Sequence, residues 1–381
     1  MLNKRRYFIF LLALVLASGG IGCNPTTKQP QSVRIGAVLT LSGSGEEIGK
    51  LCRRGFELGA EAANRETKGP KIEVIYEDSK TQGADGLTAF NKLVSSDGVK
   101  IAVVQSTVVA SAVAPTAEQS KVLMIGTNSV QKGLANGKNY IMRFYPDAEL
   151  SADTVAGYVK ARYKRLAVFY LQNVYGQAAF QAVSQRFPGD GRQIVFSEPV
   201  APDASDLRTL ISKMLTTKPD VIFTPVYGSV STALIRQIRE QDPNIPIIGD
   251  VPLANPTVYK PLGATGDGMV LPATPMDGGI ARTPLQEQFI RDYLAKFGEN
   301  PSVSVAIHYD IARLLSDAIA NTDGSPEAVR KYIISQQNYN GLTAGLRFDQ
   351  YGESLMELIP LRVVGGKLIS IAESKAAAAG K

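Results

Sequence analysis

The chain has 381 residues, enough for two domains with full-sized cores, and its 44% hydrophobic and 20% charged residues disfavour disorder, collagen and coiled coil. Two cysteines and a single histidine, His308, exclude a disulfide scaffold and a Cys-rich zinc module, and most hydrolase triads and histidine-based metal sites need more. The net charge of +6 falls to +3 without Lys4, Arg5 and Arg6, which is too weak and too evenly spread to indicate nucleic acid.

The N-terminus is typical of an export signal. The three cations precede an apolar run over 7–17, small residues over 18–22 and then Cys23. The apolar run is too short for a stable membrane span. A cysteine directly after small residues resembles a bacterial lipoprotein signal, which implies removal of residues 1–22 and a lipid anchor on Cys23. Ordinary secretion with an unmodified cysteine is the alternative. The polar stretch that follows, through residue 32, suits a tether.

The next 240 or so residues alternate short apolar strands with amphipathic helices, a pattern that predicts parallel sheets covered on both faces. The expected strands are 33–39, 72–76, 101–104, 122–125, 166–171, 194–197, 221–224 and 247–249. The expected helices are 47–65, 83–95, 108–120, 150–163, 175–187, 204–216 and 229–240. They fall into two blocks, joined near Tyr145-Pro146-Asp147. Cys52 shares one face of the first helix with apolar residues, so we interpret it as core.

After Pro272 the alternation of strands and helices ends. A Pro- and Gly-rich segment over 272–284 suggests a passage between the blocks. Helices are expected near 285–297, 303–321 and 326–335, followed by strands 346–348, 357–364 and 368–371. Residues 376–381 are low in complexity, and we expect a disordered tail.

Ligands of open parallel sheets bind at the carboxyl ends of the strands, so the loops after each strand are the candidate site. In the first block these loops contain Ser106 and Thr107, and Asn128 and Ser129. Hydroxyls and free N–H groups at a helix start favour an anion such as a carboxylate, although ordinary helix capping explains them equally well. The glycines of loop 41–49 weakly match a dinucleotide fingerprint, and we favour a glycine turn.

In the second block Tyr175, Tyr227 and Asp250 follow successive strands. Tyrosines there can wall a cleft, and Asp250 can supply a carboxylate to a cation; each also fits a turn. We find no catalytic motif and no metal or cofactor motif: G-x-S-x-G, H-E-x-x-H and the P-loop are absent. His308 lies in an expected helix, so we interpret it as a packing or surface residue and not as a catalytic one.

An ordered set of segments resembles the leucine/isoleucine/valine-binding protein family, the type I periplasmic solute-binding proteins of ABC importers. The segments are IGAVLTLSGSGEEIGKLCRRGFELGAEAAN, VLMIGTNS, NVYGQ, VIFTPVYGSVSTALIRQIR, GMVLPATP and GLRFDQYGE, and the likeness runs from about 33 to 371. It implies an α/β fold of two discontinuous lobes joined by three crossover strands. One lobe is then 33–146 plus 276–347, and the other 147–275 plus 348–375.

The resemblance also assigns roles position by position. The loops with Ser106, Thr107, Asn128 and Ser129 fall where the family holds the α-carboxylate, and Tyr175 and Tyr227 fall on cleft tyrosines. The acidic residue for the α-amino group falls near Asp250, although the register gives Val251, and Ile48 replaces an aromatic residue. These departures put an ordinary branched-chain amino acid in doubt.

The function that follows is a lipid-anchored, periplasm- or surface-facing receptor that closes on a small polar ligand and delivers it to an ABC permease. We expect no catalytic activity, no cofactor, no nucleic-acid partner and a monomer. A sensor for a membrane signalling partner, a binder of amides, urea or small organic acids and, least favoured, an exported enzyme are the alternatives. An operon that also encodes a permease and an ATPase would distinguish an importer receptor from a sensor.

Overall fold

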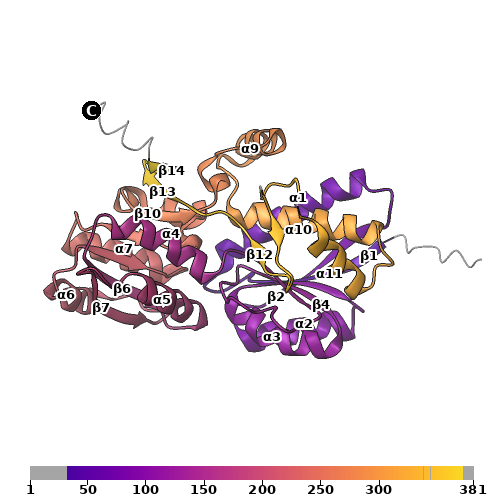
Figure 1. Ribbon diagram of the computed structural model, residues 1–381, viewed down its shortest axis with the longest axis horizontal. Coiled ribbons are helices and arrows are strands. Elements are labelled where there is room, and N and C mark those ends of the chain that lie inside the picture. The colour runs from indigo at the N-terminus through magenta and orange to yellow at the C-terminus, as the bar shows by residue number, and fades with distance from the viewer. Residues whose placement is uncertain (1–31, 338, 344, 372–381) are drawn as a thin grey trace, which may run out of the picture.

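The computed structural model describes residues 32–337, 339–343 and 345–371. They form two lobes lying side by side, each built on its own mostly parallel sheet, with three passages of the chain between them (Figure 1). The predicted two-lobed α/β fold is therefore confirmed. The predicted signal, the lipidation site Cys23, most of the tether and the tail at 376–381 lie outside the described residues. None of the helices that the structure describes is both long and apolar enough to cross a membrane.

Lobe 1 contains a five-stranded parallel sheet whose residues alternate between two buried faces. In spatial order its strands are β2 (Lys71–Asp78), β1 (Ser32–Leu39), β3 (Ile101–Gln105), β4 (Leu123–Thr127) and β5 (Ile141–Phe144). One face is covered by α2 (Gly83–Ser95) and α3 (Thr107–Ser120), and the other by α1 (Glu46–Glu66), α10 (Val303–Ala320) and α11 (Pro326–Ser335) (Figure 1). Helices that lie 240 residues apart in the chain thus share one core.

Lobe 2 contains a seven-stranded sheet. Its strands in spatial order are β14 (Lys367–Ser370), β13 (Ile359–Val364), β10 (Val270–Ala273), β9 (Ile247–Gly249), β8 (Val221–Thr224), β6 (Arg165–Leu171) and β7 (Gln193–Val200). Only β13 and β14 run antiparallel to their neighbours. Its helices are α4 (Ala148–Lys160), α5 (Val174–Arg186), α6 (Arg208–Thr216), α7 (Ser229–Gln241), α8 (Pro256–Tyr259), η1 (Val251–Ala254) and η2 (Lys260–Gly266).

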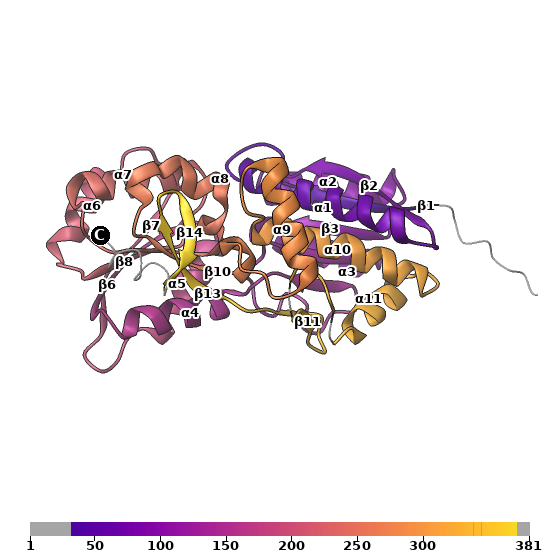
Figure 2. The same cartoon turned by 90° about the horizontal axis from the view of Figure 1, so that it is seen from above.

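The chain passes between the lobes three times: from β5 into α4, from β10 through η3 (Pro275–Gly278) into α9 (Pro284–Phe297), and from β12 (Ser354–Leu355) into β13. Figure 2 shows these passages on one side of the junction, so they can act as a hinge. The third passage comes later than the expected 348, because β11 (Arg347–Phe348) pairs with β12 beside lobe 1.

A buried ion pair ties the first passage to the third. Arg143, with 1% of its side chain exposed, binds the carboxylate of Glu353, and the backbone N–H of Ala135 donates to the same carboxylate at 2.8 Å. A charged residue within a four-residue strand hides the apolar pattern, which is why β5 was not expected from sequence. The short helices between residues 251 and 266 were also not expected.

Candidate ligand-binding site

The carboxyl ends of the parallel strands of the two lobes face each other across a cleft. Its space, including the part open to solvent, is about 430 Å³. The residues that line this interlobe cleft come from both lobes: Thr40, Gly45, Ile48, Thr81, Gln105, Ser106, Thr107, Asn128, Val130, Tyr145, Tyr175, Tyr227 and Pro252. Five of the seven residues predicted for ligand binding lie in this set.

Ser106 and Thr107 form the wall where β3 passes into α3. Ser106 is the N-cap of α3, and its hydroxyl accepts a hydrogen bond from Val109 N at 3.3 Å. The hydroxyl of Thr107 accepts one from Val130 N at 3.1 Å, which ties the start of α3 to the loop after β4. Both hydroxyls keep their own protons for another acceptor. The wall therefore combines a helix N-terminus with hydroxyl donors.

Gln105, the last residue of β3, contributes an amide to the same wall. Its Oε1 accepts a hydrogen bond from Thr40 N at 2.8 Å, and only 3% of the residue is exposed. Because a backbone N–H needs an acceptor, this bond fixes the orientation of the amide and leaves Nε2 unused. The hydrogen bonds among the described residues include none from Gln105 Nε2.

Residues of α1 and α10 hold the side-chain amide of Asn128 in place. Its Nδ2 donates to Ser304 Oγ at 3.0 Å, and its Oδ1 accepts from Cys52 Sγ at 3.4 Å. Cys52 is buried, as expected for a core residue, and burial raises the pKa of its thiol.

The single histidine lies directly behind this loop. His308 is fully buried between Thr127 Oγ1, 3.0 Å from Nε2, and Ser304 O, 2.7 Å from Nδ1. Since the carbonyl can only accept, Nδ1 carries the proton and Nε2 accepts from Thr127. Burial lowers the pKa of His308 to about 4, so the ring is neutral at pH 7 and braces the end of β4.

Backbone strain marks the same wall. Seven of the described residues other than glycine have positive φ, and three of them, Thr81, Ser106 and Asn128, line the interlobe cleft. Ser106, at φ 79° and ψ 147°, occupies a region that residues with a Cβ rarely adopt. Such strain, at about 1–3 kcal/mol for each residue, persists where the surroundings fix it, and it clusters at functional sites.

The lobe 2 wall is built around two tyrosines. The rings of Tyr175 and Tyr227 lie 5.2 Å apart between centroids. Tyr175 OH donates to Asp250 Oδ2 at 2.7 Å, and Tyr227 OH accepts from Asn173 Nδ2 at 3.2 Å. Burial raises the pKa of Tyr227 to about 12 and also raises the pKa of Tyr175 well above its usual range, so both phenols are protonated at pH 7.

Asp250 does not line the interlobe cleft. It is 1% exposed, and its carboxylate accepts hydrogen bonds from Ser151 Oγ, Tyr175 OH and Val251 N. Burial raises the pKa of this carboxyl. Its oxygens already have partners within lobe 2, among them the hydroxyl of the lining residue Tyr175, so a contact between Asp250 and the ligand stays a prediction.

Ser129 is the other predicted residue outside the lining. It is completely buried beneath the loop, where its carbonyl accepts from Arg143 Nη1 at 3.3 Å and its hydroxyl has no hydrogen-bond partner among the described residues. Its two neighbours, Asn128 and Val130, line the cleft, and a ligand contact of Ser129 itself stays a prediction.

The two lobes touch at the mouth of the cleft. A Cβ placed on Gly228 of lobe 2 would lie 2.6 Å from the carbonyl oxygen of Ser44 in lobe 1, so the two backbones are in contact. A wider opening beyond this point shares Gly45 and Ile48 with the inner cleft. The structure therefore shows the lobes closed over the site.

Several lining residues were not predicted from sequence. Gln105 directly follows the expected strand 101–104 but was not given a ligand role, Tyr145 belongs to the first passage between the lobes, and Thr81 lies in a loop without a motif. Tyr145 OH is buried and has no hydrogen-bond partner among the described residues. A polar residue closing an apolar strand, as Gln105 does, is the one signal that could have been used.

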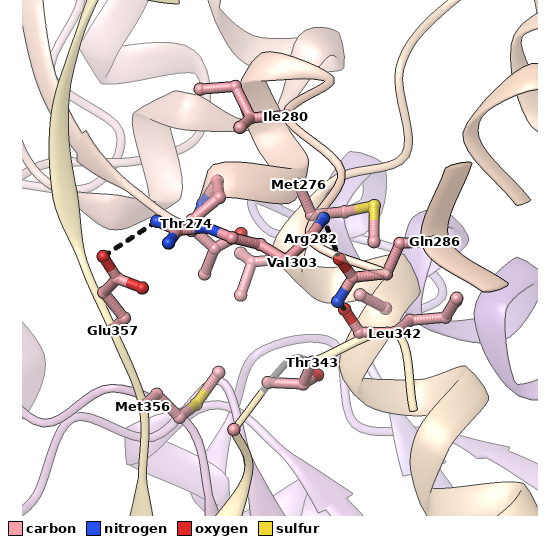
Figure 3. Close-up of a pocket in the computed structure, with 13 residues that line it drawn as sticks. Thr274, Met276, Ile280, Arg282, Gln286, Val303, Leu342, Thr343, Met356 and Glu357 are labelled. Carbon is pink, nitrogen blue, oxygen red and sulfur yellow. Dashed lines mark hydrogen bonds and ion pairs between the residues drawn. The ribbon is translucent and has the colours of Figure 1, made fainter. Parts of the chain in front are cut away.

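A second hollow lies on the passages themselves, with about 730 Å³ of space including its open part. Figure 3 shows Arg282 facing Glu357 at 3.0 Å on one side and Gln286 bonded to Leu342 O at 2.8 Å on the other. These polar side chains already have hydrogen-bond or ion-pair partners, and of the strands in the two large sheets only β10 ends at this hollow, at Thr274. It is larger than the interlobe cleft but a weaker candidate.

Comparison with known proteins identifies the family of the chain. Residues 32–363 match the family model described as periplasmic binding protein. A curated relative, Leu/Ile/Val-binding protein homolog 3 of Brucella melitensis, is 27% identical over 241 residues, which is 61% of this chain and 64% of the relative. The match thus spans slightly less than two thirds of that protein's length.

Solved structures share the fold at low identity. The branched-chain amino acid transporter substrate-binding protein LivJ of Streptococcus pneumoniae, in complex with isoleucine, has a TM-score of 0.81 at 20% identity and covers 88% of this chain and 97% of its own. A solute-binding protein from R. palustris in complex with benzoate has a TM-score of 0.82 at 16% identity, with 89% and 95% covered. With a model match over most of its length and this architecture, the chain belongs to the periplasmic binding protein family, with the type I two-lobed fold.

Proposed function

We propose that this protein is the extracytoplasmic receptor of an ABC importer, and that it binds a small polar solute between its lobes by hinge closure. The observation that carries the proposal is the interlobe cleft, lined from both lobes by the strand-end loops that bind ligands in parallel-sheet proteins. The Brucella relative, named as a Leu/Ile/Val-binding protein homolog, and the LivJ complex support amino acids or related compounds as ligands. The benzoate complex extends the candidates to organic acids.

Ligand binding is tested first. A thermal-shift screen of amino acids, amides, urea and small organic acids identifies a ligand, since a compound at 100 times its Kd stabilises by about 2.7 kcal/mol. Titration calorimetry of the hit then gives its affinity. If no compound of any class shifts the melting temperature, the receptor proposal loses its support.

The proposed anchor is a separate matter. We propose that Cys23 carries a lipid that holds the receptor at the membrane, facing the periplasm or the cell surface, where it meets the permease as a monomer. Replacing Cys23→Ser and fractionating the cells tests this. The variant should leave the membrane fraction, and a variant that stays as membrane-bound as the wild type would contradict lipidation.

A further inference from the structure

The hydroxyl groups in the interlobe cleft are available as hydrogen-bond donors. Each already accepts an N–H: Thr81 Oγ1 from Gly45 N at 3.2 Å, Ser106 Oγ from Val109 N at 3.3 Å, Thr107 Oγ1 from Val130 N at 3.1 Å and Tyr227 OH from Asn173 Nδ2 at 3.2 Å. A hydroxyl approached by an N–H turns its own proton elsewhere. None of these protons meets an acceptor among the described residues, so they are free for a ligand.

Two more hydrogen-bond donors are available to a ligand. Gln105 is 97% buried, and its Nε2 has no partner although its Oε1 is engaged. Tyr145 OH is buried and donates to no acceptor among the described residues; burial raises its pKa well above the usual range, although the neighbouring Asn128 side chain lowers it, so the phenol keeps its proton. A buried hydroxyl that donates no hydrogen bond costs about 1–3 kcal/mol, which a bound acceptor would recover.

The polar side chains of the cleft have oxygen atoms that can accept a hydrogen bond, but none of them carries a negative charge. Gln105 Oε1 and Asn128 Oδ1 already accept hydrogen bonds, from Thr40 N and Cys52 Sγ. No Asp, Glu, Lys, Arg or His side chain is among the described residues that line the cleft. The buried carboxylate nearest along the lobe 2 wall, Asp250, bonds to Tyr175 and already accepts three hydrogen bonds within lobe 2. A ligand ammonium would therefore be buried without a counter-charge, at a cost of several kcal/mol.

We propose that the ligand is a small monocarboxylate without an ammonium group. This rests on the proposed receptor function and narrows its ligand class. The carboxylate would lie at the start of α3, where Gln105 Nε2 and the Ser106 and Thr107 hydroxyls meet the positive end of a 14-residue helix. Its apolar part would pack on Ile48, Val130 and the tyrosine rings.

The test compares matched compounds on the full mature chain by titration calorimetry. Each set contains an acid, its amide and the amino acid with the same side chain: 3-methylbutanoate, 3-methylbutanamide and valine; 4-methylpentanoate, 4-methylpentanamide and leucine; and 3-phenylpropanoate with its counterparts. In at least one set the acid should bind about 100-fold more tightly than both counterparts, because only the acid satisfies the donors without adding a cation.

The inference is overturned if, in every set, the amino acid or the amide binds as tightly as its acid, and also if every acid fails to bind. Small-angle scattering separates this failure from failure of the receptor function. If valine binds and compacts the molecule, the receptor proposal stands and only the ligand class is wrong.

A pair of variants tests where the carboxylate lies. Gln105→Glu keeps an oxygen for Thr40 N but turns a negative charge toward the cleft, so the affinity for the acid should fall about 100-fold or more. Gln119→Glu makes the same change at an exposed position at the far end of α3 and should alter the affinity by less than about twofold. Equal affinities of Gln105→Glu and the wild type would overturn the placement, and the ligand comparison on the wild type holds whether or not this variant folds.

Discussion

The two walls of the cleft are made by the same structural element and treat their polar groups differently. In each lobe a parallel strand ends and a helix begins. On lobe 1 the groups of Gln105, Ser106 and Thr107 accept backbone hydrogen bonds and keep their donors unused. On lobe 2 the carboxylate of Asp250 accepts hydrogen bonds from the hydroxyls of Ser151 and Tyr175.

The difference indicates a division of labour. The lobe 1 wall has unused hydrogen-bond donors, so it can hold a ligand before the lobes meet. The polar groups of the lobe 2 wall mostly bond to each other, so that wall presents rigid aromatic rings to the ligand. We therefore expect lobe 1 to capture the ligand and lobe 2 to close over it, in keeping with hinge closure in two-lobed receptors. The predictions below test this contrast, from the largest expected effect to the smallest.

Asp250→Ala should act on the stability of lobe 2 more than on ligand contact. It leaves the Ser151 and Tyr175 hydroxyls and Val251 N buried without their shared acceptor. The free energy of unfolding should fall by about 4 kcal/mol in urea titrations. Ser129→Ala, which removes a buried hydroxyl without a partner, is the matched control and should change it by less than about 1 kcal/mol. A large loss of affinity at unchanged stability would return Asp250 to the ligand.

His308 should make the lobe 1 wall sensitive to acid. Its pKa of about 4 in the folded protein is below the ordinary 6.5, so the unfolded chain binds the proton more readily between these values. Its contribution to stability is complete above pH 6.5 and is lost as the pH falls toward 4. The difference in unfolding free energy between wild type and His308→Gln should therefore shrink by about 3 kcal/mol from pH 7 to pH 4.

Asp277 and Asp310 titrate in the opposite sense. Burial raises the pKa of each to about 6, so their contributions are lost as the pH rises through 6. Both carboxyls are present in wild type and in His308→Gln, so their effect cancels in the difference. A difference that does not change with pH would show that His308 is not neutral and buried as described.

Gly228→Ala should hinder closure. Gly228 has φ 76°, and a Cβ there would meet Ser44 O at 2.6 Å across the lobes. Gly268→Ala is the control, since it has φ 83° and no atom within 4 Å of the added Cβ. Both should lose about 1 kcal/mol of stability to backbone strain, but only Gly228→Ala should lose affinity, by about tenfold. Equal affinities in calorimetry would mean that the lobes do not meet at this point in the complex.

Tyr227→Phe should have the smallest effect. The ring and its packing on Tyr175 remain, and one donor to the ligand is lost together with the bond from Asn173. The affinity should fall about threefold, mainly through faster dissociation in stopped-flow measurements, because this side chain covers a ligand held by lobe 1. A slower association rate instead would place Tyr227 in the capture step.

The sequence predicts the fold and part of the cleft for a physical reason. Strand-end loops converge wherever parallel sheets face each other, so Ser106, Thr107, Asn128, Tyr175 and Tyr227 could be predicted to lie together. Their roles toward a ligand remain proposals.

The direction of a side chain depends on partners far away in the chain. Asp250 turns toward Ser151, 99 residues away, and Gln105 toward Thr40, 65 residues away. The pairing of Arg143 with Glu353 across 210 residues is equally invisible in sequence, and it moves the third passage beyond its expected place. Such long-range polar pairs decide which groups are left for a ligand.

The most direct test of the account is small-angle X-ray scattering of the wild type with and without the ligand found by the screen, recorded beside Gly228→Ala and Gly268→Ala. Ligand should reduce the radius of gyration of the wild type and of Gly268→Ala. The radius of gyration of Gly228→Ala should fall less at the same ligand occupancy. Identical scattering of the wild type with and without saturating ligand would contradict capture by lobe 1 and closure by lobe 2.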